Sequence, residues 1–445
     1  MADASKRLDA KDEPRRPRPR ASAFSRRLAL EGGRSATLAA LLLFLLGFLP
    51  LPFGSLATLA FLLAGLVALV EVLVRRVPFR FAGGVRFAVI TAFAYYAVDA
   101  AAVIFYGDRG RAWMPAVESI HFLLFPFVLA VIASVRDSDP LRLFVMGARI
   151  GAMAGFAIAL VQAVDSINRV VGGMINPIPF GSTAALFAFI SLVRVGEEGR
   201  AGRVLAVAAF AAGLGASLLS QSRAGWMAVP VLAIVVIAYF AVRYGRRTAL
   251  LSGLALAAIA IIVGFLGRGA LNERIEETVA MFRNFEFGQE RDTRAPEYSL
   301  DQRALMLVYG AEVFVDRPLL GYGPHNAVAA VQARAAGDGN TIDVFGHLHN
   351  EMLTEAVGNG IVGLVTLFLI LAAPLVVALR STRDDRYAAR IAIAALLTAS
   401  WLVFGLTGQT FRHDISNTVY LGILLALAAD AVRSARTAAA VRPNG

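Results

Sequence analysis

The sequence predicts an all-α fold, a polytopic membrane helix bundle of about twelve transmembrane helices with a large helical periplasmic loop. Its composition is the first observation in favour. Of the 445 residues, 58% are hydrophobic and 17% are charged, whereas soluble globular proteins contain about 45–50% apolar and about a quarter charged residues. The second is that uncharged apolar stretches recur along most of the chain, each long enough to cross about 30 Å of hydrocarbon. The chain has no cysteine, so disulfides and thiolate chemistry are excluded.

A hydropathy window moved along the chain divides the apolar stretches into twelve predicted spans. The first two are joined by the Pro- and Gly-containing turn "LPLPFG", which is typical of a tight hairpin. The predicted spans cover residues 36–50, 54–74, 86–106, 116–134, 141–164, 178–195, 203–220, 224–243, 248–266, 357–379, 388–406 and 416–434.

The distribution of arginine predicts the orientation of these spans. With the N-terminus inside, every connection on the inner side carries at least two arginines, as in "RRVPFR", "RYGRR" and "RSTRDDRYAAR". The short outer connections carry few, among them Arg169, Arg223 and Arg412. Positive charge is retained on the cytoplasmic side, so both termini are expected in the cytoplasm. The net charge of +11 is therefore attributed to topology and contact with anionic membrane lipids, and not to nucleic acid.

One connection breaks the pattern of short loops. Residues 267–350 are polar and are expected on the periplasmic side, and loops of this length are usually functional. Two amphipathic helices are expected within it, over 271–285 and 299–317. The predicted organisation is a disordered basic cytoplasmic tail over 1–34, nine spans over 35–266, the periplasmic loop over 267–350, three spans over 351–435 and a cytoplasmic tail over 436–445.

His349 is the main catalytic candidate. It precedes an apolar span and is spaced by steps of three and four from Leu353, Ala356, Gly360 and Gly363, which would place all five on one helix face. An imidazole with a pKa near 6.5 can accept a proton near neutral pH. A helix-capping or interfacial histidine is the plainer interpretation, and the neighbouring Asn350 is equally compatible with a cap.

Two arginines are predicted on the same membrane face as His349. Arg223 lies in the turn "SQSRAGW" beside Gln221, and Arg303 lies near the start of a loop helix. Arginine binds phosphate groups bidentately and stays charged. Taken singly, Arg223 could be a snorkelling arginine at the membrane interface, and Arg303 could be a solvated surface arginine. Together with His349 they predict an outer-face site for a phosphorylated, lipid-linked molecule.

The histidines could alternatively bind a metal. His347 and His349 would not converge from one helix, and no carboxylate or cysteine cluster accompanies them, so no metal and no cofactor is expected. The chain also lacks a GxxxxGK[ST] motif, so nothing indicates ATP use. Asp139 and Asp384, in cytoplasmic loops, are interpreted as solvated charges.

The segment "HNEMLTEAVGNGIVG" resembles the signature of the bacterial O-antigen ligase and O-antigen polymerase superfamily. The signature is His, then Asn, Ser or Gln, nine residues, Gly, two residues and then Gly, Thr or Tyr, here His349, Asn350, Gly360 and Gly363. "SQSRAGW" and "QRALMLVYGAEVFVDRPLLGYGPHN" are similar to the family's other conserved segments. The resemblance is specific over 218–226 and 300–364, and elsewhere it depends on span count.

The resemblance implies a metal-independent, inverting glycosyltransferase of polysaccharide or lipopolysaccharide biosynthesis. It would move a glycan from undecaprenyl diphosphate to a lipid A–core or similar acceptor hydroxyl at the periplasmic face. It assigns His349 the role of base or orienting group, and Arg223 and Arg303 the binding of the diphosphate. Supporting candidates are Asn350, Gln221, Arg412 and His413.

Three alternatives remain at this point. A polymerase of O-antigen or exopolysaccharide shares the signature, so the motif cannot choose between polymerase and ligase. A polysaccharide transporter or flippase would more often show internal repeats and charges or broken helices at the midplane. A non-catalytic scaffold for cell-wall assembly is the third.

Overall fold

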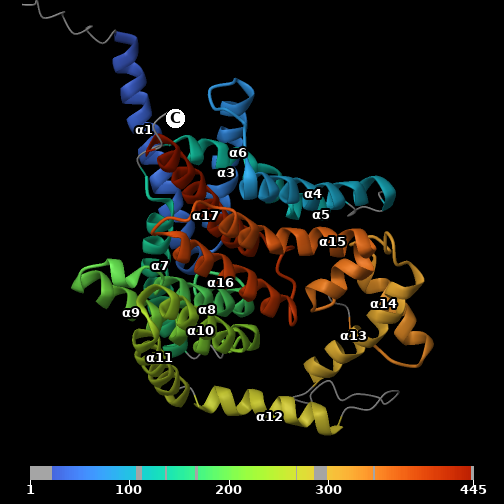
Figure 1. The fold of residues 1–445 in the computed structure, drawn as a ribbon. Helices are drawn as coiled ribbons and strands as arrows, with labels where there is room; N and C mark the ends of the chain where they lie inside the picture. Colours follow the sequence, from blue (N-terminus) through green and yellow to red (C-terminus); the bar gives the residue numbers. More distant parts are fainter. Residues whose placement is uncertain are drawn as a thin grey trace, which may run out of the picture.

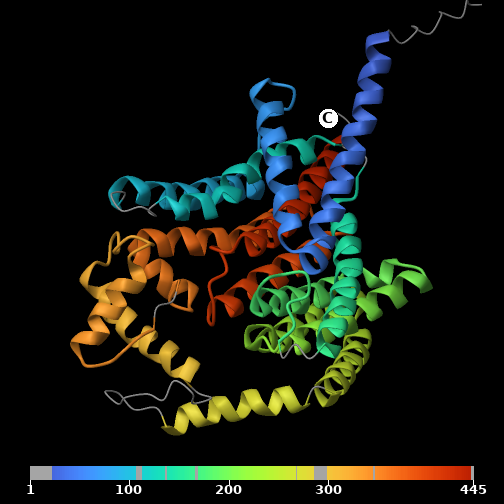
Figure 2. The ribbon, with the colours of Figure 1, turned by 180° about the vertical axis from the view of Figure 1, so that it is seen from behind.

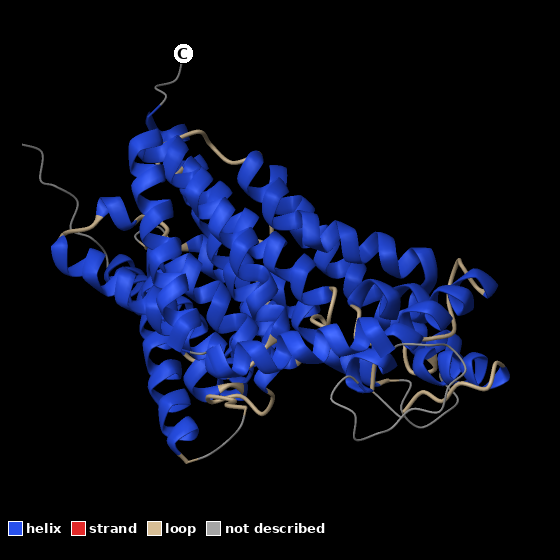
Figure 3. Ribbon diagram, turned by 90° about the horizontal axis from the view of Figure 1, so that it is seen from below, coloured by secondary structure: helices blue, strands red, loops and turns tan. Residues whose placement is uncertain are grey.

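In a computed structural model, the protein is helical throughout the part of the chain that can be described. The described residues are 23–106, 113–135, 138–165, 169–266, 268–284, 298–343 and 346–441, and none of them lies in a strand (Figure 3). The all-α prediction is confirmed. Arg109 and Arg111, two further arginines of an outer connection, lie outside the described residues.

Within the described residues, ten helices are long and apolar enough to cross a bilayer, which indicates a multi-pass membrane protein. Two shorter apolar helices, within α1 and at α8, correspond to the other two predicted spans, so the number twelve stays a prediction. The ten spans are α3 (Ser55–Leu73), α4 (Gly83–Tyr106), α5 with α6 (Met114–Glu118, Ile120–Ser134), α7 (Pro140–Val164), α9 (Arg200–Leu219), α10 (Arg223–Tyr244), α11 (Arg246–Leu266), α15 (Glu351–Leu379), α16 (Tyr387–Gly405) and α17 (Asp414–Val441).

The remaining helices of the described residues are one long N-terminal helix, three shorter helices and three helices of the long loop. The first of them, α1, begins at Ala23, within the segment predicted as a tail, and α17 extends to Val441. The remaining elements are α1 (Ala23–Phe48), α2 (Pro50–Phe53), α8 (Pro177–Ser191), η1 (Val195–Glu197), α12 (Arg268–Asn284), α13 (Tyr298–Asp316) and α14 (Ala327–Gly337).

The core of the bundle forms around α17 and α8. In α17, 89% of the apolar window is buried by neighbouring helices, whereas in α11 the share is 11%. Figures 1 and 2 show α17 (dark red) crossing the middle of the molecule, with its C-terminal end beside α1. Close crossings need small residues. A Cβ at Gly147 of α7 would lie 2.1 Å from the Phe44 carbonyl oxygen of α1.

The loop helices α13 and α14 have an apolar core of their own. Leu305, Met306 and Tyr309 of α13 pack with Val331 of α14, and the cluster continues onto Leu353 of α15. α14 was not predicted from the sequence. α12 and α13 coincide with the two predicted amphipathic helices.

A break in α15 joins this loop unit to the membrane bundle. Gly360 has φ of 66° and ψ of −154°, which interrupts the helix. The carbonyl oxygens of Val357 and Gly358 accept hydrogen bonds from the N–H groups of Tyr322 and Gly323, each at 2.8 Å. In return, Ile361 N donates to Pro318 O at 2.7 Å. The run "RPLLGYG" and the broken part of α15 therefore form one joint. Each segment supplies hydrogen-bond partners for backbone N–H and C=O groups of the other.

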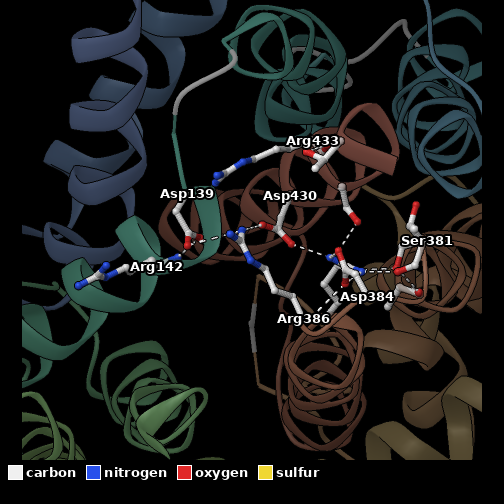
Figure 4. A network of polar contacts seen from close by, with 12 residues as sticks. Asp139, Arg142, Ser381, Asp384, Arg386, Asp430 and Arg433 are labelled. Atoms are coloured by element: carbon white, nitrogen blue, oxygen red, sulfur yellow. Dashed lines mark hydrogen bonds and ion pairs between the residues drawn. The ribbon is translucent and has the colours of Figure 1, made fainter. Parts of the chain in front are cut away.

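At the opposite end of α17 from Asp414, arginines and aspartates form a network across several helices (Figure 4). Arg390, fully buried, donates to Asp430 at 2.9 Å and to Asp384 at 2.6 Å. Arg386 pairs with Asp430 at 3.0 Å and lies 3.5 Å from Asp139, whose side chain also caps α7. Interpreting Asp139 and Asp384 as solvated charges was therefore wrong, because these carboxylates neutralise arginines that the bundle buries.

Candidate active site

The turn between α9 and α10 places Arg223 at the first position of α10. Ser222 caps this helix by accepting the N–H of Gly225 at 3.3 Å. Gln221 has a left-handed φ of 54°, which reverses the chain. A Cβ at Gly181 would lie 1.9 Å from Ser220 Oγ, so α8 packs directly against the turn. The position of Arg223 is thus fixed by close packing.

Three guanidinium groups meet in one cavity beside this turn, which we call the arginine cavity. Its volume is about 100 Å³. Arg223 comes from α10, Arg303 from α13 and Arg169 from the segment that precedes α8. Burial and the charge of Arg169 lower the pKa of Arg303, which indicates that these cations lie close together. The other lining residues are Ile178, Gln221, Ala224, Glu277, Ser299 and Thr407.

Glu277 of α12 supplies the carboxylate of the arginine cavity. It forms an ion pair with Arg223 through Oε2 and Nη2. In the described part of the chain, no carboxylate pairs with Arg303. Three arginines and one glutamate give the cavity a formal charge that suits an anion.

His349 does not lie on the helix face predicted from its spacing. α15 begins at Glu351, and Asn350 is its N-cap, accepting the N–H of Leu353 at 2.9 Å. His349 precedes the cap with a left-handed φ of 51°. Its N–H donates to Nδ1 of His347 at 3.0 Å, and the ring centroids are 4.3 Å apart. The helix-face prediction was wrong because Asn350 caps α15, which begins only at Glu351, two residues after His349.

A second cavity, the histidine cavity, has a volume of about 120 Å³. Three imidazoles line it, those of His347, His349 and His413, together with the aromatic rings of Trp401 and Phe404. Ile178 and Ala224 line both cavities, so the two adjoin. The other lining residues are Asn176, Pro179, Ser182, Thr183, Gly408, Gln409, Thr410 and Ser416.

Besides burial, the charge of Arg303 contributes to the lowered pKa values of His347 and His349. Burial, His347 and Arg303 together lower the pKa of His349 to about 3. Burial, Arg303 and His413 lower the pKa of His347 to about 4. Both imidazoles are therefore neutral at pH 7 and in the form that can accept a proton.

The supporting candidates occupy different places. Gln221 lines the arginine cavity and His413 lines the histidine cavity, where burial lowers the pKa of His413. Asn350 donates to the Leu406 carbonyl at 3.3 Å and so fastens the start of the α16–α17 loop. Arg412 is not among the described residues that line either cavity.

Arg412 instead belongs to a buried network beneath the histidine cavity. Its Nη2 donates to Asp99 Oδ1 at 2.8 Å and to Glu355 Oε1 at 3.1 Å. Tyr95 and Asn359 also donate to Glu355, at 3.2 Å and 2.8 Å. The network joins α4, α15 and the loop before α17, so Arg412 holds the loop that carries His413.

A second carboxylate fastens the same loop. Glu351, buried at the start of α15, accepts hydrogen bonds from the N–H groups of Thr410 and Phe411 and from the Thr410 hydroxyl. Thr410 also lines the histidine cavity. This wall of the cavity is therefore set by α15, the helix that follows His349.

The comparisons with known proteins agree with this arrangement. Residues 208–368 match the family model described as O-Antigen ligase. The match supports a similarity to the O-antigen ligase-like superfamily over this segment of the chain. No curated protein matches the chain. The superfamily consists of glycosyltransferase-like membrane enzymes that use lipid-linked glycans.

The matched segment contains Arg223, Glu277, Arg303 and His349, whereas Arg169 and the loop before α17 lie outside it. Its signature glycine Gly363 has a structural reason. A Cβ there would lie 2.9 Å from Glu355 Oε2, so the glycine leaves room for the buried network.

Sequence reasoning missed several residues of the candidate site. Arg169 was counted only for topology, although an arginine on the sparsely charged outer side was a usable signal. Trp401 and Phe404 could not be separated from other aromatic residues of a span. Glu277 gave no signal, because it is one of several glutamates on α12. Among the described residues, no group of three or more His, Asp or Glu side chains is arranged to hold a metal ion.

Proposed function

We propose that the protein transfers a glycan from undecaprenyl diphosphate to a hydroxyl of lipid A–core or a similar acceptor, at the periplasmic face of the bacterial inner membrane. The observation that carries the proposal is the pair of adjoining cavities. One cavity offers three guanidiniums and the other offers neutral imidazoles and aromatic rings. A diphosphate fits the first chemistry, and a sugar hydroxyl fits the second.

In this reaction the acceptor oxygen attacks the anomeric carbon of the donor. The bond between that carbon and the diphosphate oxygen breaks, and its electron pair leaves with the diphosphate. Arg223, Arg303 and Arg169 stabilise the charge that develops on this leaving group. Because attack occurs on the side opposite the leaving group, the anomeric configuration is inverted. No step requires a metal ion.

His349 receives the proton that the acceptor hydroxyl loses. Its imidazole is neutral before the donor binds, because burial, His347 and Arg303 lower its pKa to about 3. An anionic diphosphate in the arginine cavity offsets the charge of Arg303, so donor binding raises the pKa of His349. The base therefore becomes stronger when the donor is in place.

The site is tested by substituting the three principal residues in purified protein that is supplied with a lipid-linked glycan and an acceptor. We expect His349→Ala, Arg223→Ala and Arg303→Ala each to lower the rate by about 10²–10³, the usual effect of losing one such group, with near-normal membrane levels. His347→Ala should be milder, since its ring contacts His349 but is not the proposed base. Equal losses at His347 and His349, with full sensitivity to EDTA, would favour a metal site instead.

Gene deletion distinguishes ligase from polymerase. The sizeable helical loop unit, from α13 to α14, favours a large lipid-anchored acceptor. Loss of a ligase should leave lipid A–core without O-chain while polymerised glycan remains on undecaprenyl diphosphate. A single-repeat band on lipid A–core would refute the ligase assignment and identify a polymerase.

A further inference from the structure

The burial pattern of α12 is the reverse of an ordinary amphipathic helix. Glu277 is 9% exposed, whereas the apolar residues Ile275 and Val279 are 51% and 41% exposed. Burying a carboxylate is unfavourable unless a cation pairs with it. The ion pair with Arg223 supplies that partner, so Glu277 attaches α12 to the site through its charge.

Beyond Glu277, α12 contacts the helices that flank it in the chain. The helix packs against α11 and α13, and both views show it along the edge of the molecule (Figures 1 and 2). Glu273 and Glu276 on the same helix are exposed. Of the three glutamates of α12, only Glu277 reaches the arginine cavity.

Glu277 and a phosphate group would compete for the same guanidinium. A carboxylate and a phosphate both bind arginine through two oxygens in a plane. The side chains of Arg223 and Glu277 are 20% and 11% exposed, so their attraction is only partly screened by solvent. Glu277 therefore occupies the place at Arg223 that an anionic ligand needs.

We infer that Glu277 is an affinity-determining residue, a carboxylate that holds Arg223 until the donor diphosphate displaces it. The inference rests on the proposed function of the arginine cavity. Displacement of Glu277 removes an ion pair that attaches α12 to the site, so donor binding is coupled to loosening of this helix. Removing the carboxylate should then tighten donor binding, the opposite of what loss of a substrate-binding residue would do.

The test measures the Kd of undecaprenyl diphosphate for the full chain in lipid nanodiscs. Glu277→Gln should bind about three- to tenfold more tightly than the wild type, because the ligand no longer competes with an ion pair of modest strength. Glu276→Gln is the matched control, since it removes the same charge from an exposed position of the same helix. Its Kd should be unchanged.

A double-mutant cycle attributes the effect to the Arg223 contact. In the Arg223→Gln background, Glu277→Gln should no longer tighten binding, because the two side chains act through one interaction. The chain has no cysteine, so a fluorophore on Glu273→Cys reports on α12 alone. Its emission should change when undecaprenyl diphosphate is added and should already be shifted in Glu277→Gln.

Three results would overturn the inference. These are weaker binding by Glu277→Gln, unchanged binding, and tighter binding that Glu276→Gln reproduces. Weakening that appears only with Mg²⁺ would assign Glu277 to a metal-bridged substrate contact. If the wild type does not bind the lipid diphosphate and Arg223→Gln changes nothing, the proposed function itself fails.

Discussion

Arg412→Ala should destabilise the protein and not simply inactivate it. The Arg412 side chain is 8% exposed, and its two partners Asp99 and Glu355 are 2% and 1% exposed. Removing the guanidinium would leave two carboxyl groups buried without a cation. Breaking a buried pair in this way costs about 3–5 kcal/mol. The matched control is Arg334→Ala, which also pairs with two carboxylates but is 39% exposed, where a pair contributes about 0–1 kcal/mol.

The assay is thermal unfolding of the purified protein in detergent, together with its level in the membrane. Arg412→Ala should lower the unfolding midpoint strongly, and Arg334→Ala should leave it close to the wild type. Replacing Asp99 by Asn and Glu355 by Gln in the Arg412→Ala background should recover part of the loss, since no charge is then left uncompensated. A wild-type midpoint with a large loss of kcat would refute this reasoning and place Arg412 in the substrate site.

Three further predictions follow from the joint, the histidines and the topology. Gly360→Ala should destabilise the protein by about 1–3 kcal/mol, because the φ of Gly360 is 66° and a Cβ there would lie 2.3 Å from the Leu319 carbonyl oxygen. The control in the same unfolding assay is Gly337→Ala, since a Cβ at Gly337 would meet nothing within 4 Å. His347 and His349 have pKa values lowered to about 4 and 3, so their contribution to stability is complete above pH 6.5 and is lost as the pH falls toward 4 and 3. The variant with both histidines replaced by Gln should therefore show a smaller decrease in unfolding midpoint between pH 7 and pH 5 than the wild type. A decrease equal to that of the wild type would contradict this. Alkaline phosphatase inserted after Gly339 should be active in cells, whereas an inactive fusion would contradict a periplasmic loop.

Hydropathy predicted the membrane spans but not their places in the bundle. α11 is more apolar than α17, yet 11% of its apolar window is buried by other helices against 89% in α17. The order is reversed because lipid and protein interior are both apolar, so the most apolar helix can remain on the outside. Burial in α17 is indicated instead by polar side chains such as Thr418 and Asp430, which find partners within the bundle.

The candidate site was predictable in its residue types and not in its local geometry. Arg223, Arg303 and His349 were selected from turns and signature spacing, and the structure brings Arg223 and Arg303 into one cavity and His349 into the next. The spacing of His349 from Gly360 suggested a continuous helix face, but Asn350 caps the helix and Gly360 breaks it. The break at Gly360 is stabilised by backbone hydrogen bonds with the distant segment from Pro318 to Gly323, which no local pattern contains, whereas the Asn350 cap is local and was open to prediction.

The proposed transfer depends on a base that is weak when alone and stronger when the donor is bound. Burial and His347 lower the pKa of His349 most, and the charge of Arg303 in the arginine cavity lowers it further. A diphosphate brings more negative charge to the same cavity than one carboxylate does, so it shields His349 more completely. Proton removal from an acceptor is thereby favoured once the leaving group is bound, and the imidazole stays neutral in its absence. The two cavities adjoin through Ile178 and Ala224, and this adjacency allows one binding event to prepare both halves of the reaction.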